Sequence, residues 1–181
     1  MKAILRTLIM ITALVAALVS VTWITKDRLD SMRNHRVEIA SLNFKEVDRQ
    51  LKCMTDNLYY EAAMEPTEGK IAVAQVVMNR VDSPQFPKDV CAVVYQKSTF
   101  ASGVLCQFTW LCDGSVGRNP INRELYRNCE EVAKRVMLEG FRLPSLEGAL
   151  YYHADYVNPR WRKIRVAKIG RHIFYKPMEA V

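Results

Sequence analysis

The sequence predicts an α+β domain, mainly helical with a small antiparallel sheet, behind an N-terminal apolar helix. Residues 7–25 carry no charged side chain, which is typical of a membrane-crossing helix. The middle of the chain repeats apolar residues at spacings of three and four, as helices do. The last third has β-branched and aromatic segments at 150–152, 164–166 and 173–175, which predict short strands. Helices followed by an antiparallel sheet form an α+β domain.

The N-terminal segment, residues 1–25, is expected to be a single-pass membrane anchor. Lys2 and Arg6 precede the apolar run, and this positive flank favours a cytoplasmic N-terminus. The rest of the chain would then lie on the periplasmic side of the inner membrane. A cleaved signal peptide, giving a secreted protein, is the alternative. We favour the anchor because Ser20–Val21–Thr22, at the end of the run, is a poor cleavage site.

The remaining chain divides into a charged spacer, residues 26–50, and a domain, residues 51–181. The spacer mixes charges of both signs with few large apolar residues, and we expect it to hold the domain away from the membrane. The domain has the usual length of a single folding unit.

Apolar periodicity predicts helices over residues 44–64, 68–81, 87–95 and 125–136. The second of these is apolar almost all round, which predicts the buried helix of the core. Thr67 is its expected cap. Residues 103–119 hold most of the loop-forming residues in the middle of the chain, and we expect a long loop there.

The cysteines favour disulfides in an exported, oxidising setting; they are Cys53, Cys91, Cys106, Cys112 and Cys129. No pair has the short spacing of a zinc site. We expect one or two disulfides among Cys91, Cys106 and Cys112, bracing the loop at 103–119. Cys53 and Cys129 fall at helical positions and are expected to be packed thiols. We expect no metal and no cofactor.

Glu61 is the residue that the sequence singles out for catalysis. It lies in an apolar and aromatic run, at the border of the helical face that includes Leu58 and Ala62. A Glu in that place is expected to be half-buried at the wall of a cleft. Burial raises a carboxyl pKa, as a general acid working near neutral pH requires. The structural alternative is a Glu that pairs with a buried Arg or caps a neighbouring helix.

Further motifs follow Glu61 in a recognisable order. They are Tyr-x-Glu-Ala at 59–62, Ala-Val…Asn-Arg-Val at 72–81, Gln-Phe at 107–108, Asp-Gly at 113–114, Tyr-Tyr-His at 151–153 and Gly-x-His-x-Phe at 170–174. From about Leu51 to Lys176 the chain resembles the SleB/CwlJ-type cell wall hydrolases, the spore-cortex-lytic enzyme family. The resemblance implies a lysozyme-like fold and cleavage of the glycan strand of peptidoglycan. It also implies lytic transglycosylase activity, with Glu61 as the catalytic acid.

The number of carboxylates needed distinguishes the possible reactions. A retaining or inverting glycosidase needs a second one, for which Asp113 and Asp155 are the candidates; Asp113, before Gly114, is also typical of a turn. A lytic transglycosylase needs one Glu, which serves as acid and then base and gives 1,6-anhydromuramyl products. The single Glu61 favours this reaction. A hydrolytic muramidase, an amidase and a non-catalytic peptidoglycan-binding envelope protein are the alternatives.

The candidates for substrate contact are Tyr60, Asn79, Gln107, Tyr152 and His153. The aromatic side chains, together with Tyr151 and Trp161, are suited to stacking on sugars, with core packing as the alternative. Asn79, Gln107 and His153 are suited to hydrogen-bonding hydroxyl or N-acetyl groups, and Asn79 equally to capping its helix. His172 is expected to be structural.

Charge points to an anionic partner outside the cytoplasm. Seven Lys and Arg residues stand between 157 and 181 against a single Glu179. Such a basic segment suits the carboxylates of peptidoglycan stem peptides. Nucleic acid is disfavoured because of the export segment and because no nucleic-acid-binding motif is present. The expected partners are therefore peptidoglycan and, through the N-terminal helix, the membrane.

Overall fold

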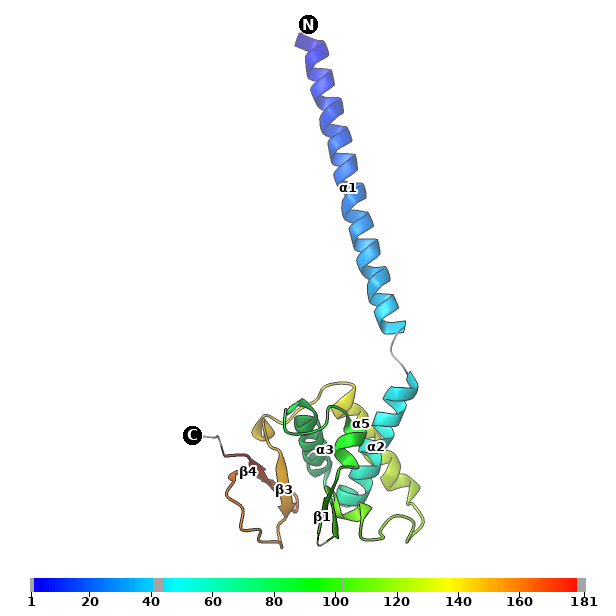
Figure 1. Ribbon diagram of the computed structural model, residues 1–181. Helices are drawn as coiled ribbons and strands as arrows, with labels where there is room; N and C mark the ends of the chain where they lie inside the picture. Colours follow the sequence, from blue (N-terminus) through cyan, green and yellow to red (C-terminus); the bar gives the residue numbers. More distant parts are fainter. Residues whose placement is uncertain (1, 41–43, 102, 179–181) are drawn as a thin grey trace. The chain divides into compact units, whose positions relative to one another are not determined.

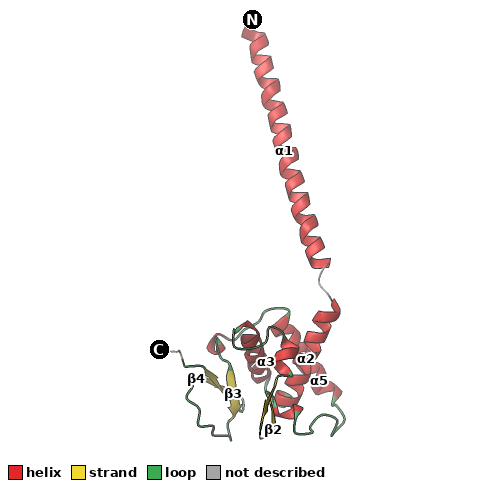
Figure 2. Cartoon of the chain, in the orientation of Figure 1, coloured by secondary structure: helices red, strands yellow, loops and turns green. Residues whose placement is uncertain are grey.

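A computed structural model describes residues 2–40, 44–101 and 103–178 of the chain. Its contacts divide the chain into two compact units, Met1–Phe44 and Lys45–Val181. All strands of the described part belong to the second unit (Figure 2).

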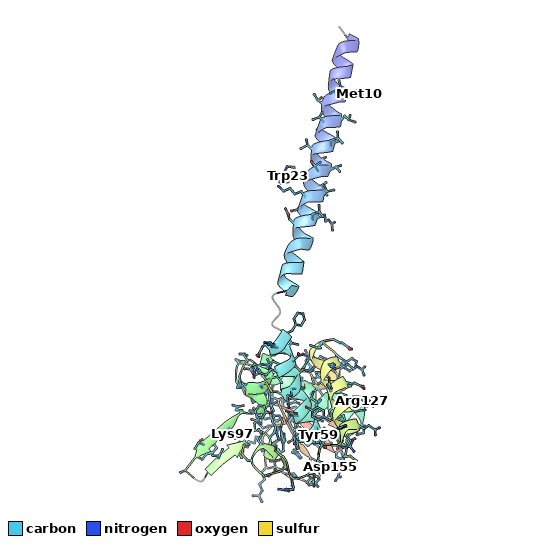
Figure 3. All side chains as sticks on the ribbon, turned by 90° about the vertical axis from the view of Figure 1, so that its right-hand side faces the viewer. Met10, Trp23, Tyr59, Lys97, Arg127 and Asp155 are labelled. Carbon is cyan, nitrogen blue, oxygen red and sulfur yellow. A yellow bond between two sulfur atoms is a disulfide. The ribbon has the colours of Figure 1, made fainter. Side chains whose placement is uncertain are left out.

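The first unit is one helix, α1 (Lys2–Ala40). Its stretch Met10–Asp30 is long and apolar enough to cross a membrane, by length and composition, and none of the stretch is buried. Met10 and Trp23 project from it, each 74% exposed (Figure 3). The helix continues into the expected spacer as far as Ala40, and residues 41–43 lie outside the described part.

The second unit has helices first and its larger sheet last (Figure 1). Its helices are α2 (Phe44–Ala62), α3 (Thr67–Asp82), α4 (Val90–Val94) and α5 (Arg123–Met137), with short 3-10 turns η1 (Thr109–Leu111) and η2 (Pro144–Leu146). Its strands are β1 (Lys97–Phe100), β2 (Gly103–Cys106), β3 (Tyr151–Ala154), β4 (Ile164–Ile169) and β5 (His172–Lys176). The predicted α+β class, with small antiparallel sheets, is confirmed.

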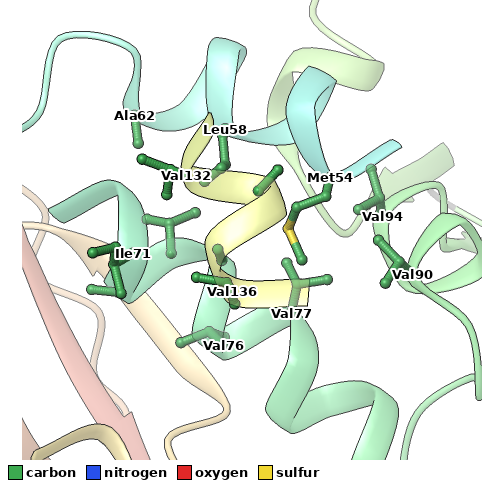
Figure 4. Packing of buried hydrophobic residues seen from close by; sticks show 14 of the residues in the cluster. Met54, Leu58, Ala62, Ile71, Val76, Val77, Val90, Val94, Val132 and Val136 are labelled. Carbon is green, nitrogen blue, oxygen red and sulfur yellow. The ribbon is translucent and has the colours of Figure 1, made fainter. Parts of the chain in front are cut away.

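The core forms around α3, as its apolar composition predicts. Val73, Val76 and Val77 of α3 are fully buried, and side chains of α2, α4 and α5 surround them (Figure 4). From α2 these include Met54 and Leu58, also fully buried. Each such side chain contributes about 1.5–3 kcal/mol to folding. This packing fixes α2, and with it the backbone that carries Glu61.

The three-stranded antiparallel sheet has the order β3-β5-β4. The central strand β5 pairs with β3 in a register that sets Tyr152 opposite Phe174, which is fully buried. The turn between β4 and β5 lies at Gly170, whose φ of +55° favours glycine. The three predicted strands and this turn are confirmed.

Two local predictions were wrong. The expected loop at 103–119 begins with a strand, because β1 and β2 form an antiparallel hairpin. Nearly all its side chains are exposed, so the hairpin has no alternation of buried and exposed residues to reveal it. Thr67 is the first residue of α3 and not its cap; Pro66 occupies the cap position and makes no side-chain hydrogen bond.

Two disulfides are present, Cys53–Cys91 and Cys106–Cys112. The second braces the segment after β2, as expected. The expectation that Cys53 is a packed thiol was wrong, because α4 lies against α2 and sets the Cα atoms of Cys53 and Cys91 5.2 Å apart. Cys129 is a buried free thiol, as expected.

Candidate active site

A cavity of about 690 Å³ lies beside the end of α2. Its lining comes from the β1–β2 hairpin and the segment through Ser115, and from β3, the β3–β4 connection and the start of β5. Most of the predicted site residues line it; they are Tyr60, Glu61, Gln107, Tyr152 and His153. Segments far apart in the sequence therefore meet at the predicted catalytic residue.

Glu61 is the penultimate residue of α2 and is half-buried, as its place on the helix predicts. Its neighbours Leu58 and Ala62 are buried in the core and fix this last turn. The hydroxyl of Tyr152 donates a hydrogen bond to Glu61 Oε2 at 3.2 Å. The carboxyl is thus held at the cavity by the helix on one side and by β3 on the other.

Burial raises the pKa of Glu61 above its usual value of 4.5. The hydrogen bond from Tyr152 and the positive charge of Arg80 oppose this rise in the pKa, while the negative charge of Asp113 adds to it. Burial prevails, so the carboxyl keeps its proton to a higher pH than a free Glu. The same surroundings offer a donor and a cation to the carboxylate once the proton has left.

Arg80 is a site residue that the sequence analysis missed. Its guanidinium, from α3, is buried, donates from Nε to Leu150 O at 2.9 Å and lies 5.3 and 5.4 Å from the rings of Phe86 and Phe108. An arginine near the end of a helix with an apolar centre was the available signal, because a buried cation needs partners. Arg80 lines the same cavity as Glu61, and its positive charge favours the ionised form of Glu61.

Gln107 is fixed by Arg80. With its amide oxygen facing the guanidinium, Gln107 accepts hydrogen bonds from Nη1 and Nη2 at 3.2 and 3.3 Å. In this orientation the amide oxygen bonds to Arg80, so the amide nitrogen is the group that can donate to another partner. Gln107 lines the cavity. The amide nitrogen could therefore still serve as the hydrogen-bond donor in the predicted contact with a substrate.

Tyr152 is held in place by His172. The two rings meet edge to face, 5.1 Å apart at 87°. Burial and the nearby Glu61 raise the pKa of Tyr152 well above its usual range, so its hydroxyl stays a donor. Burial lowers the pKa of His172, which favours the neutral ring. His172 packs within the sheet, as expected, and it also lines the cavity.

Tyr60 and His153 line the cavity with rings that already have partners. Tyr60 stacks on Trp110 at 4.7 Å and 17°, and the indole nitrogen of Trp110 donates to Asn57 Oδ1 at 3.2 Å. Both ring nitrogens of His153 lie 2.8 Å from an oxygen, one from Ala154 O and the other from the hydroxyl of Tyr175. The polar atoms of His153 therefore have partners within the protein, and its ring also stacks on Tyr175 at 5.3 Å and meets Trp161 edge to face at 5.6 Å.

Asn79 is the predicted site residue that the structure places elsewhere. Its amide donates to Leu146 O and to Ala149 O, both at 2.9 Å, and it does not line the cavity. Asn79 thus ties α3 to the segment that leads into β3, because those carbonyls need a donor where the chain turns. Its amide nitrogen thus has partners within the protein, and its contact with substrate stays a prediction.

The two candidate second carboxylates differ in position. Asp113 is an exposed turn residue that accepts from Ser115 N at 2.8 Å, which lowers its pKa, and it lines the cavity. Asp155 pairs with Lys168 at 3.0 Å and does not line the cavity. Within the described residues no group of three or more His, Cys, Asp or Glu side chains is placed to hold a metal ion.

Glu65, just after the end of α2, contacts the turn that precedes β5. Its Oε2 accepts a hydrogen bond from Arg171 N at 2.9 Å. A Cβ at Gly170 would lie 1.9 Å from the same oxygen, so a larger residue would have to displace the Glu65 carboxylate from Arg171 N. This contact between Glu65 and residues 170–171, the Glu65–turn contact, joins the helix of Glu61 to the strand of His172. No local sequence pattern predicts this contact.

Comparison with known proteins identifies relatives of this chain. The model of the cell wall hydrolase family Hydrolase_2 matches residues 64–175, beginning just after Glu61. Spore cortex-lytic enzymes of Halalkalibacterium halodurans and Bacillus subtilis are 30% and 28% identical to the chain over 131 residues, 70% of its length. The chain spans only 34% and 37% of these two relatives.

Two solved structures share the fold. The catalytic domain of Bacillus cereus SleB is 30% identical, with a TM-score of 0.52, over 71% of this chain and 91% of that one. The catalytic domain of the germination-specific lytic transglycosylase SleB from Bacillus anthracis is also 30% identical, with a TM-score of 0.52, over 70% and 93%. With a family match over more than half of its length, the chain belongs to the cell wall hydrolase family.

Proposed function

We propose that the domain is a peptidoglycan lytic transglycosylase in which Glu61 acts as acid and then as base. The observation that carries the proposal is a half-buried carboxyl at a cavity, with a pKa raised by burial and a hydrogen bond from Tyr152. Membership of the cell wall hydrolase family and the lytic transglycosylase named in the Bacillus anthracis structure support the same activity.

In the first step, protonated Glu61 gives its proton to the glycosidic oxygen, and the bond from this oxygen to muramyl C1 breaks. In the second, the Glu61 carboxylate removes the proton from the C6 hydroxyl of the same muramyl unit while O6 bonds to C1. The products are a shortened strand with a new hydroxyl and a strand that ends in a 1,6-anhydro ring. Glu61 regains its proton, so no water is consumed.

Tyr152 and Arg80 stabilise the Glu61 carboxylate between the two steps. When Glu61 has lost its proton, the Tyr152 hydroxyl donates to the carboxylate and the Arg80 charge favours it. Both groups are fixed before reaction, Arg80 by Leu150 O and Tyr152 by His172. Such preorganisation stabilises charge without reorganisation during the step.

We also propose a fold type, a set of glycan contacts and a membrane location for the chain. Glu61 lies at the end of a helix, beside an antiparallel sheet and at a cavity. This placement supports a lysozyme-like arrangement. Tyr60, Gln107, Tyr152 and His153 line that cavity and would contact the glycan. The apolar stretch of α1 would anchor the chain in the inner membrane with the domain on the periplasmic side, or serve as a cleaved signal.

Hydrolysis is the second candidate, and Asp113 favours it. An exposed carboxylate with a lowered pKa lines the same cavity and is suited to activate water or stabilise a cation. A non-catalytic binding protein is disfavoured, because a binding module gains nothing from a carboxyl that is costly to ionise.

Digestion of purified sacculi by the full chain and by its Glu61→Gln variant tests the proposal. We expect anhydromuropeptides from the parent and none from the variant, read by mass spectrometry. Products with reducing ends would instead mean hydrolysis and lead to Asp113. Release of peptides from intact glycan would indicate an amidase. No products from either protein, with both bound to sacculi, would leave the binding module.

A further inference from the structure

Two aromatic side chains of the β3–β4 connection line the cavity and yet remain open to solvent. Trp161 is 43% exposed and Tyr156 is 77% exposed. Neither residue belongs to the hydrophobic core. Large aromatic groups at the mouth of a cavity favour contact with a ligand, because burying them on binding releases their surface from water.

Trp161 is held by rings that meet it at steep angles. Its ring centroid lies 5.6 Å from His153 at 83°, 6.0 Å from Tyr175 at 81° and 6.3 Å from Tyr151 at 62°. Lys163 Nζ lies 3.2 Å from the centre of the Tyr151 ring and 5.7 Å from that of Trp161. Among the described aromatic contacts, none stacks parallel on Trp161. The indole is thus oriented in advance, which lowers the entropy lost on binding.

The β1–β2 hairpin contributes further side chains to the same cavity. Leu105, on β2, is 62% exposed and lines the cavity, and Ser98, on β1, lines it beside Leu105. The hairpin that carries them, marked by Lys97 in Figure 3, projects from the rest of the domain. A ligand in this cavity would meet both apolar and polar side chains. A pyranose sugar has groups of both kinds, since its faces carry C–H groups and its rim carries hydroxyl and amide groups.

We infer that Trp161, together with Tyr156, forms a platform that stacks on an N-acetylhexosamine unit of the glycan, away from the bond cleaved at Glu61. The identity of the sugar rests on the proposed function. Glu61 and Trp161 both line the cavity, from the end of α2 and from the β3–β4 connection, so one strand can contact both. The platform contributes binding energy to substrate and transition state alike, which affects KM more than kcat.

Co-sedimentation with sacculi tests the platform, using the full chain carrying Glu61→Gln so that nothing is cleaved. We expect Trp161→Ala to weaken binding about tenfold, the loss typical of an exposed aromatic anchor. Ile164→Ala is the matched control, because Ile164 is 49% exposed on the nearby β4 and does not line the cavity. In the chain with Glu61 intact, we expect Trp161→Ala to raise KM with little change in kcat.

Each outcome decides for or against the platform. Binding by Trp161→Ala equal to that of the parent would overturn it, as would a parent chain that does not sediment with sacculi. Trp161-dependent binding without glycan cleavage by the chain with Glu61 would keep the platform and reject the transglycosylase. If Trp161→Ala unfolds at a lower temperature than the control, Trp161→Phe and Tyr156→Ala decide: unchanged binding in both overturns the inference.

Discussion

Glu61 meets two demands that conflict at the level of a single residue. As an acid it must hold its proton near neutral pH, and burial raises its pKa for that purpose. As a base it must carry a negative charge a moment later, which the same burial disfavours. The hydrogen bond from Tyr152 and the charge of Arg80 reconcile the two, because they act on the charged form.

Substitution of Tyr152 by Phe tests whether this hydrogen bond stabilises the Glu61 carboxylate. Loss of the donor destabilises the carboxylate, so the pKa of Glu61 rises further and the alkaline limb of the pH–rate profile moves to higher pH. Since a hydrogen bond to a charged group is worth about 1.5–3 kcal/mol, we expect kcat to fall about tenfold or more. Tyr151→Phe is the control, because Tyr151 lines the cavity without donating to Glu61. An unmoved alkaline limb would show that Tyr152 does not act on Glu61.

The raised pKa of Glu61 also has a cost in stability. Between the ordinary pKa of 4.5 and the raised one, the folded chain binds more protons than the unfolded chain, so stability falls as pH rises through this window. Glu61→Gln removes that cost. We expect the variant to melt at a higher temperature than the parent at about pH 7, and the difference to vanish below about pH 4. Equal melting temperatures at both pH values would contradict the raised pKa.

At the level of elements, the site depends on the positions of α2 and the sheet. The buried face of α2 sets the backbone of Glu61, and the pairing of β3 with β5 sets Tyr152. The Glu65–turn contact joins the two, from the end of α2 to the turn that precedes His172. A small shift of the sheet would therefore alter the distance from the Tyr152 hydroxyl to Glu61.

Gly170→Ala tests the Glu65–turn contact. The new Cβ would clash with Glu65 Oε2, and a non-glycine residue at this φ costs about 1–2 kcal/mol in any case. Gly117→Ala is the matched control, since Gly117 has a φ of +77° and nothing within 4 Å of the added Cβ. We expect Gly170→Ala to lower the unfolding midpoint more than the control and to reduce kcat. Equal effects of the two substitutions on stability and activity would mean that Glu65 merely touches the turn.

How far the sequence predicts each element depends on where its signal lies. The helical face of α2 and the three strands of the larger sheet have local signals, so the place of Glu61 on its helix was predictable, whereas the contact of Tyr152 with Glu61 joins distant segments. The β1–β2 hairpin was not, because its side chains are exposed on both faces. The Cys53–Cys91 pairing and the approach of Arg80 to Glu61 arise from packing between distant segments, which no local pattern encodes.

At the level of the whole molecule, the chain divides into an N-terminal unit and a second unit that contains the strands of the described part. The stretch Met10–Asp30 of α1 has the length and composition of a membrane span. The second unit contains the cavity and the two disulfides. Disulfides suit an oxidising compartment such as the periplasm. Length, charge and cysteine content, which need no packing information, predict an anchor or signal at 1–25, a spacer at 26–50 and a domain from residue 51.

Leu18→Arg tests the anchor. A charge at the centre of a membrane span costs about 2.5–3.5 kcal/mol on insertion, so we expect the variant to leave the membrane fraction on alkaline washing while the parent stays. Leu138→Arg is the control, because Leu138 is likewise exposed, at the end of α5. The mass of the membrane-bound parent separates an anchor, which keeps the first 25 residues, from a cleaved signal. Equal retention of the two variants would contradict the anchor.

The most direct test of the central claim follows the oxygen atom at the new glycan end. The full chain is incubated with sacculi in water enriched in heavy oxygen, and the released glycan ends are weighed by mass spectrometry. If Glu61 closes the ring as acid and base, the ends are anhydro sugars that carry no heavy oxygen. Reducing ends that carry it would show that water attacks C1, and would contradict the transglycosylase mechanism.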